Sequence, residues 1–384
     1  MSRSITHQHR FERVDGQAIL LVHAPARGRR LLATLAARRP LFVCTMAHTA
    51  TAEIDGLSAA GATPELRRLT AAADAEALHY GRPLCMDGVP SNPEGAPGPV
   101  IITIAALQLA GIPIELIDAG LRVKPAAPAR VLSDGWGDSI LTGRAVPHAA
   151  ELLEAGRALG AELADRADYL LLAESVPAGT TTALAVLCGL GLDAWGKVSS
   201  SMPGNAHQLK NRIARQALEA AGLGRLPRTG PSRGRSPDPL AVVAAVGDPM
   251  QPVVAGLTLG ALPRAPVLLA GGSQMVAVVA LAAALAEREG CPLDFDRLAI
   301  ATTRWVATDP TADLAGLAGQ VGDVPILASD LSFATSRHAP LRRYEEYLVK
   351  EGVGAGGAAI AAALLGVAPE RLLAQIESVY ETLR

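Results

Sequence analysis

Short apolar runs recur along the chain, and each run ends abruptly in small or polar residues. Each has only four or five residues, which is too few for a helix, and almost no polar position within it. Strands that are buried on both faces of a parallel sheet have this pattern. The predicted strands are residues 41–44, 114–117, 169–173, 267–270, 298–301 and 325–328.

Between these runs lie stretches rich in alanine and leucine that are long enough for crossover helices, among them residues 100–109, 206–221 and 274–289. The alternation of buried strands with helices predicts an α/β fold with a doubly wound, mainly parallel sheet. The chain from residue 342 onward predicts further helices, interrupted by glycines at residues 352–357.

Residues 267–286 are apolar and about as long as a helix that spans a membrane. Four small or polar residues interrupt this stretch near its start, namely Gly271, Gly272, Ser273 and Gln274. We therefore predict a buried strand, a glycine turn and a buried helix here, and no membrane helix.

Composition excludes several classes of protein. With 384 residues, 49% of them hydrophobic, the chain has ample material for a core and is not intrinsically disordered. Its formal net charge of −2 argues against general nucleic-acid binding. A basic segment at residues 222–239 is interpreted as a solvated loop rather than a nucleic-acid contact, because no aromatic residue lies among its arginines.

The cysteines and histidines suggest neither disulfides nor a metal. The four cysteines are widely spaced without a CxxC pair, as is typical of a protein in a reducing cytoplasm. Residues 1–15 are polar and lack the apolar middle region of a signal peptide. His7 and His9 form an HxH pair, but the other histidines lack metal-ligand spacing, so we expect no metal and no other cofactor.

Polar residues follow the predicted strands, and ligands of open parallel sheets bind outside the carboxyl ends of the strands. Any one of these residues is explained as an ordinary turn residue, but the same character at six strand ends indicates a binding site. They are His48, Thr49, Asp118, Gly120, Arg122, residues 174–182, 271–274 and 302–304, Asp309, Ser329, Asp330 and Ser332.

The strand-to-helix turn within residues 174–182 suits a phosphate. It offers backbone N–H groups, hydroxyls and a helix dipole, although a simple hydroxyl N-cap is the alternative. The residues concerned are Gly179, Thr180, Thr181 and Thr182. Glu174 at the strand end could accept hydrogen bonds from ribose hydroxyls. Lys210 on the next helix either reaches the phosphate as a point charge or is a solvated surface lysine.

A second informative segment, residues 350–358, places Glu351 beside several glycines that let backbone approach a ligand closely. Glu351 could act as a general base if this loop folds over the strand ends. The alternative is a charged residue in a flexible loop.

These segments resemble the nicotinate-nucleotide–dimethylbenzimidazole phosphoribosyltransferase family of cobamide biosynthesis, and in particular its divergent archaeal and bacterial branch. The order and spacing of the blocks make the resemblance specific. The family-like blocks are residues 174–187, 238–247, 266–281 and 350–359, and those typical of the divergent branch are residues 56–66 and 119–125.

The resemblance implies transfer of 5-phosphoribose from nicotinate mononucleotide to a benzimidazole-type base, with inversion at C1 and release of nicotinate. It makes Glu351 the base that takes a proton from the incoming nitrogen and Glu174 the second catalytic glutamate. It assigns the phosphate to the threonine turn and to Lys210. The further substrate-binding residues that we expect are Ser58, Gly271, Gly272, Ser273, Ser332, Gly352 and Gly354.

The resemblance also implies a large α/β phosphoribosyl-binding domain over residues 30–340. Residues 1–29 and 341–384 would form a small, mainly helical domain that completes the active site. The expected protein is a cytoplasmic homodimer whose other partners are small molecules.

The chain departs from the family pattern in two places. Gly179 stands where the family has an asparagine, and residues 196–205 replace a GRGxG-like segment. The resemblance therefore supports the binding of the sugar phosphate more strongly than it supports the identity of the acceptor base. Two alternatives stay open: transfer to another acceptor such as adenine, a phenol or water, and a nucleotide-binding regulatory protein without turnover.

Overall fold

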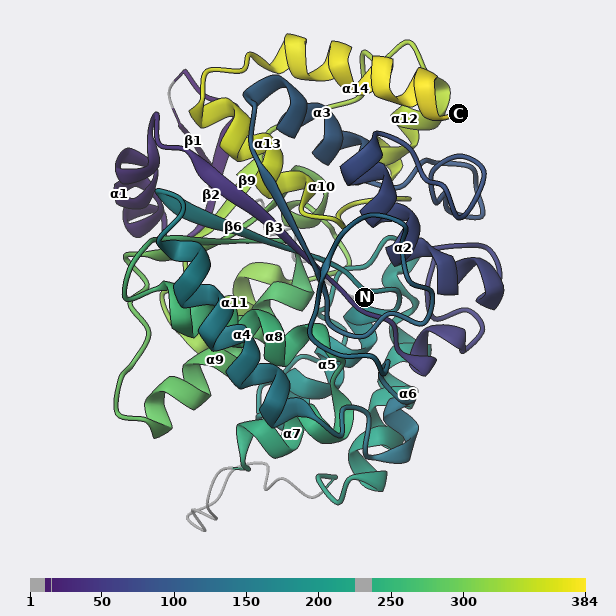
Figure 1. The fold of residues 1–384 in the computed structure, drawn as a ribbon, viewed down its shortest axis with the longest axis vertical. Coiled ribbons are helices and arrows are strands. Elements are labelled where there is room, and N and C mark those ends of the chain that lie inside the picture. Colours follow the sequence, from purple (N-terminus) through teal and green to yellow (C-terminus); the bar gives the residue numbers. More distant parts are fainter. Residues whose placement is uncertain (1–10, 15, 225–236) are drawn as a thin grey trace, which may run out of the picture.

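The computed structural model describes residues 11–14, 16–224 and 237–384, and most of these surround one sheet (Figure 1). The strand order is β1-β2-β9-β8-β7-β6-β3-β4-β5. From β9 to β5 all neighbours pair in parallel, whereas β2 is antiparallel to both β1 and β9. The doubly wound, mainly parallel α/β fold is thus confirmed.

All six predicted strands are present. Their bounds are β3 Pro40–Met46, β4 Ile114–Asp118, β6 Tyr169–Ser175, β7 Val267–Ala270, β8 Leu298–Thr303 and β9 Ile326–Ser329. The strands that were not predicted all lie at the two edges of the sheet, and they are β1 Glu12–Arg13, β2 Ile19–His23 and β5 Arg130–Val131.

The three predicted crossover helices are α3, α6 and α9, each within two residues of its predicted bounds. The helices are α1 Pro25–Leu35, α2 Pro64–Tyr80, α3 Val100–Ala110, α4 Ala149–Ala164, α5 Gly179–Gly189, α6 His207–Ala220, α7 Pro239–Val246, α8 Met250–Ala261, α9 Ser273–Arg288, α10 Arg304–Ala307, α11 Leu314–Val321, α12 Ala339–Arg342, α13 Ala355–Leu364 and α14 Pro369–Leu383.

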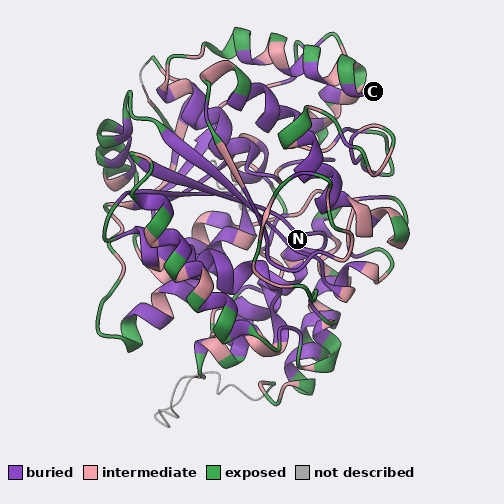
Figure 2. Cartoon of the chain, in the orientation of Figure 1, coloured by how far each residue is buried: buried purple, intermediate pink, exposed green. Residues whose placement is uncertain are grey.

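The sheet separates two hydrophobic cores, and this explains why its strands are continuously apolar. In β6, Leu170 and Leu172 face one core while Leu171 and Ala173 face the other. Helices α4, α5, α7, α8 and α9 cover the first face, and α3, α13 and α14 cover the second (Figure 1). Strands β3, β6, β7, β8 and β9 are accordingly buried along their whole length (Figure 2).

The direction in which the chain winds reverses between β3 and β6. From β3 the sheet continues outward through β4 and β5, and from β6 it continues the other way through β7, β8 and β9. Connections leave to opposite sides at such a point, which opens a crevice beyond the carboxyl ends of the two central strands. The order of the strands therefore predicts where a ligand binds.

The chain ends differ from the expected small helical domain in one respect. Residues 19–23 form β2, which belongs to the main sheet and lies between the edge strand β1 and β9. Its partial burial is typical of a strand next to the edge of a sheet. Residues 339–383 are mainly helical, with a loop before α13 that contains glycines, and α13 and α14 pack against α3. The division of the chain into two domains otherwise stays a prediction.

Residues 267–286 form β7, a glycine turn and most of α9, as predicted from the four residues that interrupt their apolar pattern. Within the described ranges, no helix is both long and apolar enough to cross a bilayer. The arginines of the basic segment, at positions 225, 228, 233 and 235, lie outside the described residues.

Candidate active site

A pocket lies beyond the carboxyl ends of β6 and β7, next to the point where the winding reverses. Its walls come from seven parts of the chain: the segment from 57 to α2, the loop before α3, the β6–α5 turn, residues 199–202, the β7–α9 turn, Val306 of α10, and the loop before α13. Segments far apart in the sequence therefore meet at the predicted edge of the sheet. The predicted residues that line the pocket are Ser58, Glu174, Gly179, Thr180, Gly272, Ser273, Glu351 and Gly352.

Glu351 is held by the backbone at the start of α13. Its Oε1 accepts hydrogen bonds from the N–H groups of Gly352 (3.1 Å) and Gly356 (3.2 Å). Its Oε2 accepts from Thr302 Oγ1 at 3.3 Å. A Cβ on Gly356 would lie 1.9 Å from the carbonyl carbon of Thr302, so only glycine allows this close approach. The loop is thus built around the carboxyl group.

Burial raises the pKa of Glu351 to about 7, although the glycine amides oppose this shift. A carboxyl with a pKa near neutral is suited to general base catalysis, because it can be ionised and still take a proton readily. The hydrogen bonds to Gly352, Gly356 and Thr302, with the partial burial of the side chain, argue against the alternative of a charged residue in a flexible loop.

Glu174 ends β6 and occupies the same pocket. Its Oε1 accepts from Gln274 Nε2 at 2.8 Å, and its Oε2 accepts from the N–H of Val176 at 3.0 Å. Burial raises the pKa of Glu174 to about 8, and the negative charges of Asp248 and Glu351 raise it further. A positive charge nearby would lower this pKa and favour the carboxylate, which would then stabilise that charge.

The β6–α5 turn is shaped by its neighbours. Ala178 adopts a left-handed conformation (φ 63°), and α5 begins at the next residue. A Cβ on Gly179 would lie 1.7 Å from Gln274 Oε1, so any side chain there would displace the glutamine that holds Glu174. This contact gives a physical reason for glycine at the position where the family resemblance suggests asparagine.

The three threonines point in different directions. Thr180 lines the pocket. Thr182 instead contacts Asp248, with 2.5 Å between Oγ1 and Oδ2, and Thr181 Oγ1 is buried without a hydrogen-bond partner in the part of the chain described. The pocket thus receives the backbone at the start of α5 and one hydroxyl, rather than three.

Other predicted residues lie behind the pocket wall or elsewhere. Gly271 donates its N–H to Ala301 O at 2.9 Å and follows the end of β7. A Cβ on Gly354 would lie 2.6 Å from the Cβ of Ala173, so this glycine packs on the sheet. Ser332 donates to Glu345 at 2.9 Å, away from the pocket.

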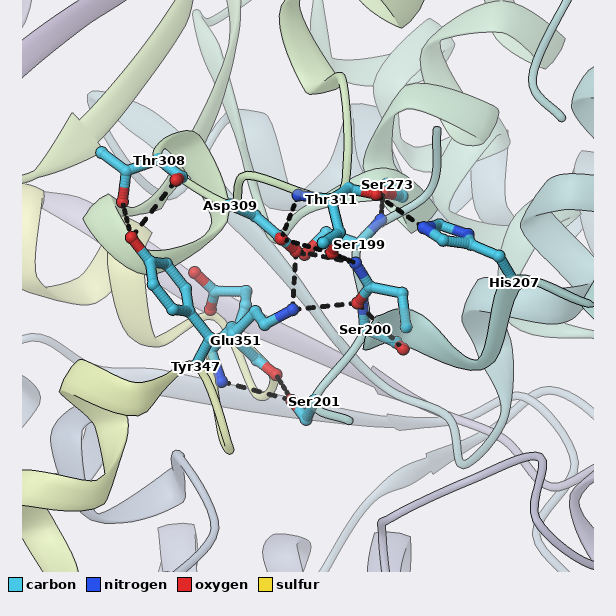
Figure 3. Close-up of polar contacts among 12 residues, drawn as sticks. Ser199, Ser200, Ser201, His207, Ser273, Thr308, Asp309, Thr311, Tyr347 and Glu351 are labelled. Carbon is cyan, nitrogen blue, oxygen red and sulfur yellow. Dashed lines mark hydrogen bonds and ion pairs between the residues drawn. The ribbon is translucent and has the colours of Figure 1, made fainter. Parts of the chain in front are cut away.

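A buried polar cluster adjoins the pocket (Figure 3). Lys350 Nζ donates to Asp309 Oδ2 at 2.6 Å and to Asn205 Oδ1 at 2.9 Å. Ser199 Oγ also donates to Asp309 Oδ2 at 2.6 Å, and Asn205 Oδ1 accepts the N–H of Ser200 at 2.7 Å. Lys350 precedes Glu351, so this cluster ties residues 199–205 to the loop that carries the glutamate.

Lys210 lies on the inner side of α6 with an exposed fraction of 0%. The alternative of a solvated surface lysine is therefore wrong. Burial lowers the pKa of Lys210 to about 7; the positive charge of Lys350 adds to this effect, and the negative charge of Asp309 opposes it. Its Nζ has no hydrogen-bond partner among the described residues, and it does not itself line the pocket. A buried, unpaired ammonium beside a pocket is suited to an anion.

Sequence reasoning missed two buried carboxyls near the site. Asp74 lies on α2 and lines the pocket, and its only sequence signal is an acidic residue within an alanine-rich run that also contains Glu76. Asp248 follows α7 and accepts hydrogen bonds from Thr182 and from the N–H of Met250. In the described part of the chain, no group of three or more His, Cys, Asp and Glu residues could hold a metal ion. His7 and His9 lie outside that part.

Comparison with known proteins finds relatives with similar sequences and solved structures that are more distant in sequence. A UPF0284 protein of Gloeobacter violaceus is 48% identical over 362 residues, which cover 92% of this chain and 91% of the relative. A UPF0284 protein of Archaeoglobus fulgidus is 43% identical, with 90% and 95% covered. A scan against models of known protein families finds no match.

Two solved structures from Thermus thermophilus share the fold. One is described as a nicotinate-nucleotide-dimethylbenzimidazole phosphoribosyltransferase, with a TM-score of 0.53, 21% identity, and 90% of this chain and 89% of that chain covered. The other is described as CobT, with a TM-score of 0.55, 22% identity and 90% of each chain covered. At this identity the likeness establishes the fold.

Proposed function

The chain belongs to the UPF0284 family, and we propose that it is a phosphoribosyltransferase. It moves 5-phosphoribose from nicotinate mononucleotide to a benzimidazole-type base and gives nicotinate and an α-riboside phosphate for assembly of the cobamide lower ligand. The proposal rests on the sequence resemblance and the shared fold. The observation that carries it is the pair of glutamates, the buried Glu174 and the partly buried Glu351, in one pocket at the reversal point of the sheet.

In the proposed reaction the bond between C1 of the ribose and the pyridinium nitrogen breaks, and its electron pair neutralises that nitrogen. A lone pair of the acceptor nitrogen forms the new bond to C1 from the opposite face, which inverts the configuration. The acceptor then carries a positive charge, which is lost when Glu351 takes its N–H proton. Glu174 stabilises the positive charge that develops on the sugar, because a buried carboxylate acts strongly at short range.

The phosphate is proposed to bind between the N-termini of α5 and α9. Gly179 and Thr180 begin one helix, Ser273 and Gln274 begin the other, and all four line the pocket. Helix N-termini carry partial positive charge and unpaired N–H groups. The buried ammonium groups of Lys350 and Lys210, balanced among the described residues by Asp309, add one net positive charge on this side.

Substitution of Lys210 by methionine tests the phosphate site. We expect affinity for nicotinate mononucleotide to fall about 10- to 100-fold, because a charge-assisted contact is lost. Affinity for nicotinate riboside, which lacks the phosphate, should not change. Lys197→Met, which changes a lysine paired with Asp193 outside the pocket lining, is the control. Calorimetry measures these affinities, and equal losses for nucleotide and riboside would contradict the assignment.

The same site predicts a pH dependence. A bound phosphate raises the pKa of Lys210 above its value of about 7 in the free protein. Binding at pH 8 is therefore accompanied by proton uptake, and affinity falls as pH rises above about 7. Titration at pH 8 in two buffers of different ionisation enthalpy should detect this proton in the unaltered protein and miss it in Lys210→Met.

The direct test of function is product formation. Purified protein is incubated with nicotinate mononucleotide and a panel of benzimidazoles, purines, phenols or water alone, and nicotinate and α-riboside phosphate are quantified. Acceptor-dependent release of both products supports the transferase. Release of nicotinate without an acceptor identifies a nucleosidase, and binding without any turnover identifies a nucleotide-binding regulatory protein.

The remaining expectations are also proposals. The partners are small-molecule substrates, and the protein is cytoplasmic and homodimeric. Large apolar side chains on the surface support a subunit contact, since apolar area of this kind is commonly covered in oligomers. These side chains are Tyr80, Leu84, Val131, Trp136 and Leu141.

A further inference from the structure

We propose that Asp74 selects the acceptor, which is a nitrogen heterocycle that carries a hydrogen-bond donor, an amino or hydroxyl group, on the edge remote from the nitrogen that attacks C1. The inference rests on the proposed transferase function and deepens it. An acceptor whose remote edge carries only methyl groups is then a poor substrate.

Asp74 is buried in the pocket wall with one oxygen unpaired. It projects from α2, its exposed fraction is 5%, and it lines the pocket. Its Oδ2 accepts a hydrogen bond from Ser175 Oγ at 2.8 Å. Among the described residues, Oδ1 has no hydrogen-bond donor and no cation pairs with the carboxyl group. The free oxygen is therefore available to a ligand.

The surroundings of Asp74 give its charge no other compensation. Its neighbours along α2 are buried alanines, among them Ala71, Ala73 and Ala75. Burial raises the pKa of Asp74 to about 7, and only the hydrogen bond from Ser175 opposes the shift. An N–H or O–H group of a ligand would satisfy the free oxygen, whereas an apolar group would leave it buried and unpaired.

The distribution of charge in the pocket assigns Asp74 to the acceptor rather than to the nucleotide. Lys350, with Lys210 behind it, lies on the side of residues 199–205, and a phosphate is attracted there and repelled by a carboxylate. The α2 side consists instead of Asp74, two hydroxyl groups and small apolar residues. A flat heterocycle fits such a wall.

The two hydroxyl groups on that wall are weaker acceptors than Asp74. The Thr70 hydroxyl donates its one proton to Ala60 O (2.7 Å) or Leu66 O (3.2 Å) and keeps its acceptor lone pairs, but it carries no charge. Ser58 Oγ already accepts the N–H groups of Ala60 (3.2 Å) and Ala178 (3.3 Å). The free oxygen of Asp74 is thus the acceptor on the α2 wall that can carry a charge and pair most strongly with a donor-bearing base.

The test compares acceptors that differ only in the donor. 5-Hydroxybenzimidazole and 5-methylbenzimidazole have nearly the same shape, and adenine provides a donor on a purine. We expect kcat/KM for α-riboside phosphate formation to be about 10- to 100-fold higher with the hydroxyl than with the methyl compound, since the latter leaves Asp74 unpaired. The reaction with adenine shows whether the protein also accepts a donor group that is carried by a purine instead of a benzimidazole.

Asp74→Leu should abolish or reverse this preference, because the leucine side chain is similar in shape to that of aspartate and packs against the methyl group. Asp74→Asn keeps one acceptor oxygen and should retain part of the preference. Glu377→Gln, which alters another buried carboxyl on α14 outside the pocket lining, is the control and should leave the ratio unchanged. If Asp74→Leu does not fold, the hydroxyl-to-methyl ratio of the unaltered protein and Asp74→Asn decide the question.

Two results would overturn the inference. They are equal kcat/KM for the hydroxyl and methyl compounds in the unaltered protein, and an unchanged preference in a folded Asp74→Leu variant. In both cases product is formed, so the transferase function stands. If no acceptor yields product, the proposed function fails and the inference falls with it.

Discussion

Replacement of Glu351 by glutamine is expected to lower kcat by about 10²- to 10⁴-fold, the usual contribution of a general base. Glutamine keeps the shape of the side chain and can still accept hydrogen bonds from Gly352 and Gly356 through its carbonyl oxygen. It cannot take the proton of the acceptor. Affinity for nicotinate mononucleotide should barely change, because the proposed phosphate and ribose contacts lie elsewhere.

The pH profile separates a base from a merely structural residue. Since Glu351 has a pKa of about 7 and Glu174 one of about 8, kcat at saturating nucleotide should rise with pH in two steps as the two carboxyls ionise. Glu351→Gln should lose the step at about pH 7 and keep the other. Glu346→Gln changes an exposed carboxyl of the preceding turn and serves as the control.

Glu174→Gln should behave differently from Glu351→Gln, because Glu174 is proposed to face the ribose and the developing positive charge. Both substrate binding and turnover should fall. A Glu351→Gln protein that melts normally and turns over its best acceptor at a near-normal rate would remove Glu351 from the mechanism. The melting temperature is measured alongside, so that a folding defect is not mistaken for lost chemistry.

The central strands were predictable because both their faces are buried. All seven residues of β6 are buried, and its first five, residues 169–173, form a continuous apolar run in the sequence. Such a run is too short for a helix and predicts a buried strand. Strands β1 and β5 have two residues each, and β2 lies near the edge with only partial burial. Their pairing depends on partners distant in the chain, such as β9 for β2, and a local pattern does not contain that information.

The residues of the candidate site also fall into two groups, those that a local sequence signal predicts and those that only the tertiary structure brings to the pocket. Glu174 and Glu351 lie directly beside a strand end and a glycine loop, which are local signals. Asp74 is one acidic residue in a helix, and only the packing of α2 beside β6 makes it part of the pocket. Lys210 shows the limit most clearly, because the sequence allowed both a phosphate-contacting and a solvated lysine, and only the tertiary structure shows that the side chain is buried.

The buried pair of Asp309 and Lys350 is expected to dominate the stability of the site. Their side chains are 1% and 2% exposed. Removal of one partner from such a pair typically destabilises a protein by about 3–5 kcal/mol, because the other charge stays buried and uncompensated. The destabilisation by Asp309→Asn should lie at the upper end of this range, since the substitution leaves two buried lysines, Lys350 and Lys210, without their anion.

Lys350→Met should be less damaging than Asp309→Asn. The carboxyl of Asp309 would still accept hydrogen bonds from Ser199, Asn205 and Thr311, whereas the lysines have no second acidic partner among the described residues. The double variant Asp309→Asn, Lys350→Met should recover part of the loss, because only Lys210 then stays unpaired. Urea denaturation midpoints of the four proteins measure this order, and a larger loss for Lys350→Met would contradict the charge argument.

Acid should weaken the same pair. Burial alone would raise the pKa of Asp309, but the hydrogen bonds from Lys350, Ser199 and Asn205 outweigh it and lower the pKa to about 2. A carboxyl whose pKa is lower in the folded state stabilises the fold above its unfolded value of about 3.9 and loses that effect as pH falls towards 2. The stability difference between the unaltered protein and Asp309→Asn should therefore be full at about pH 6 and shrink steadily between about pH 4 and pH 2. A difference that is independent of pH over that range would show that the pair contributes through shape rather than charge.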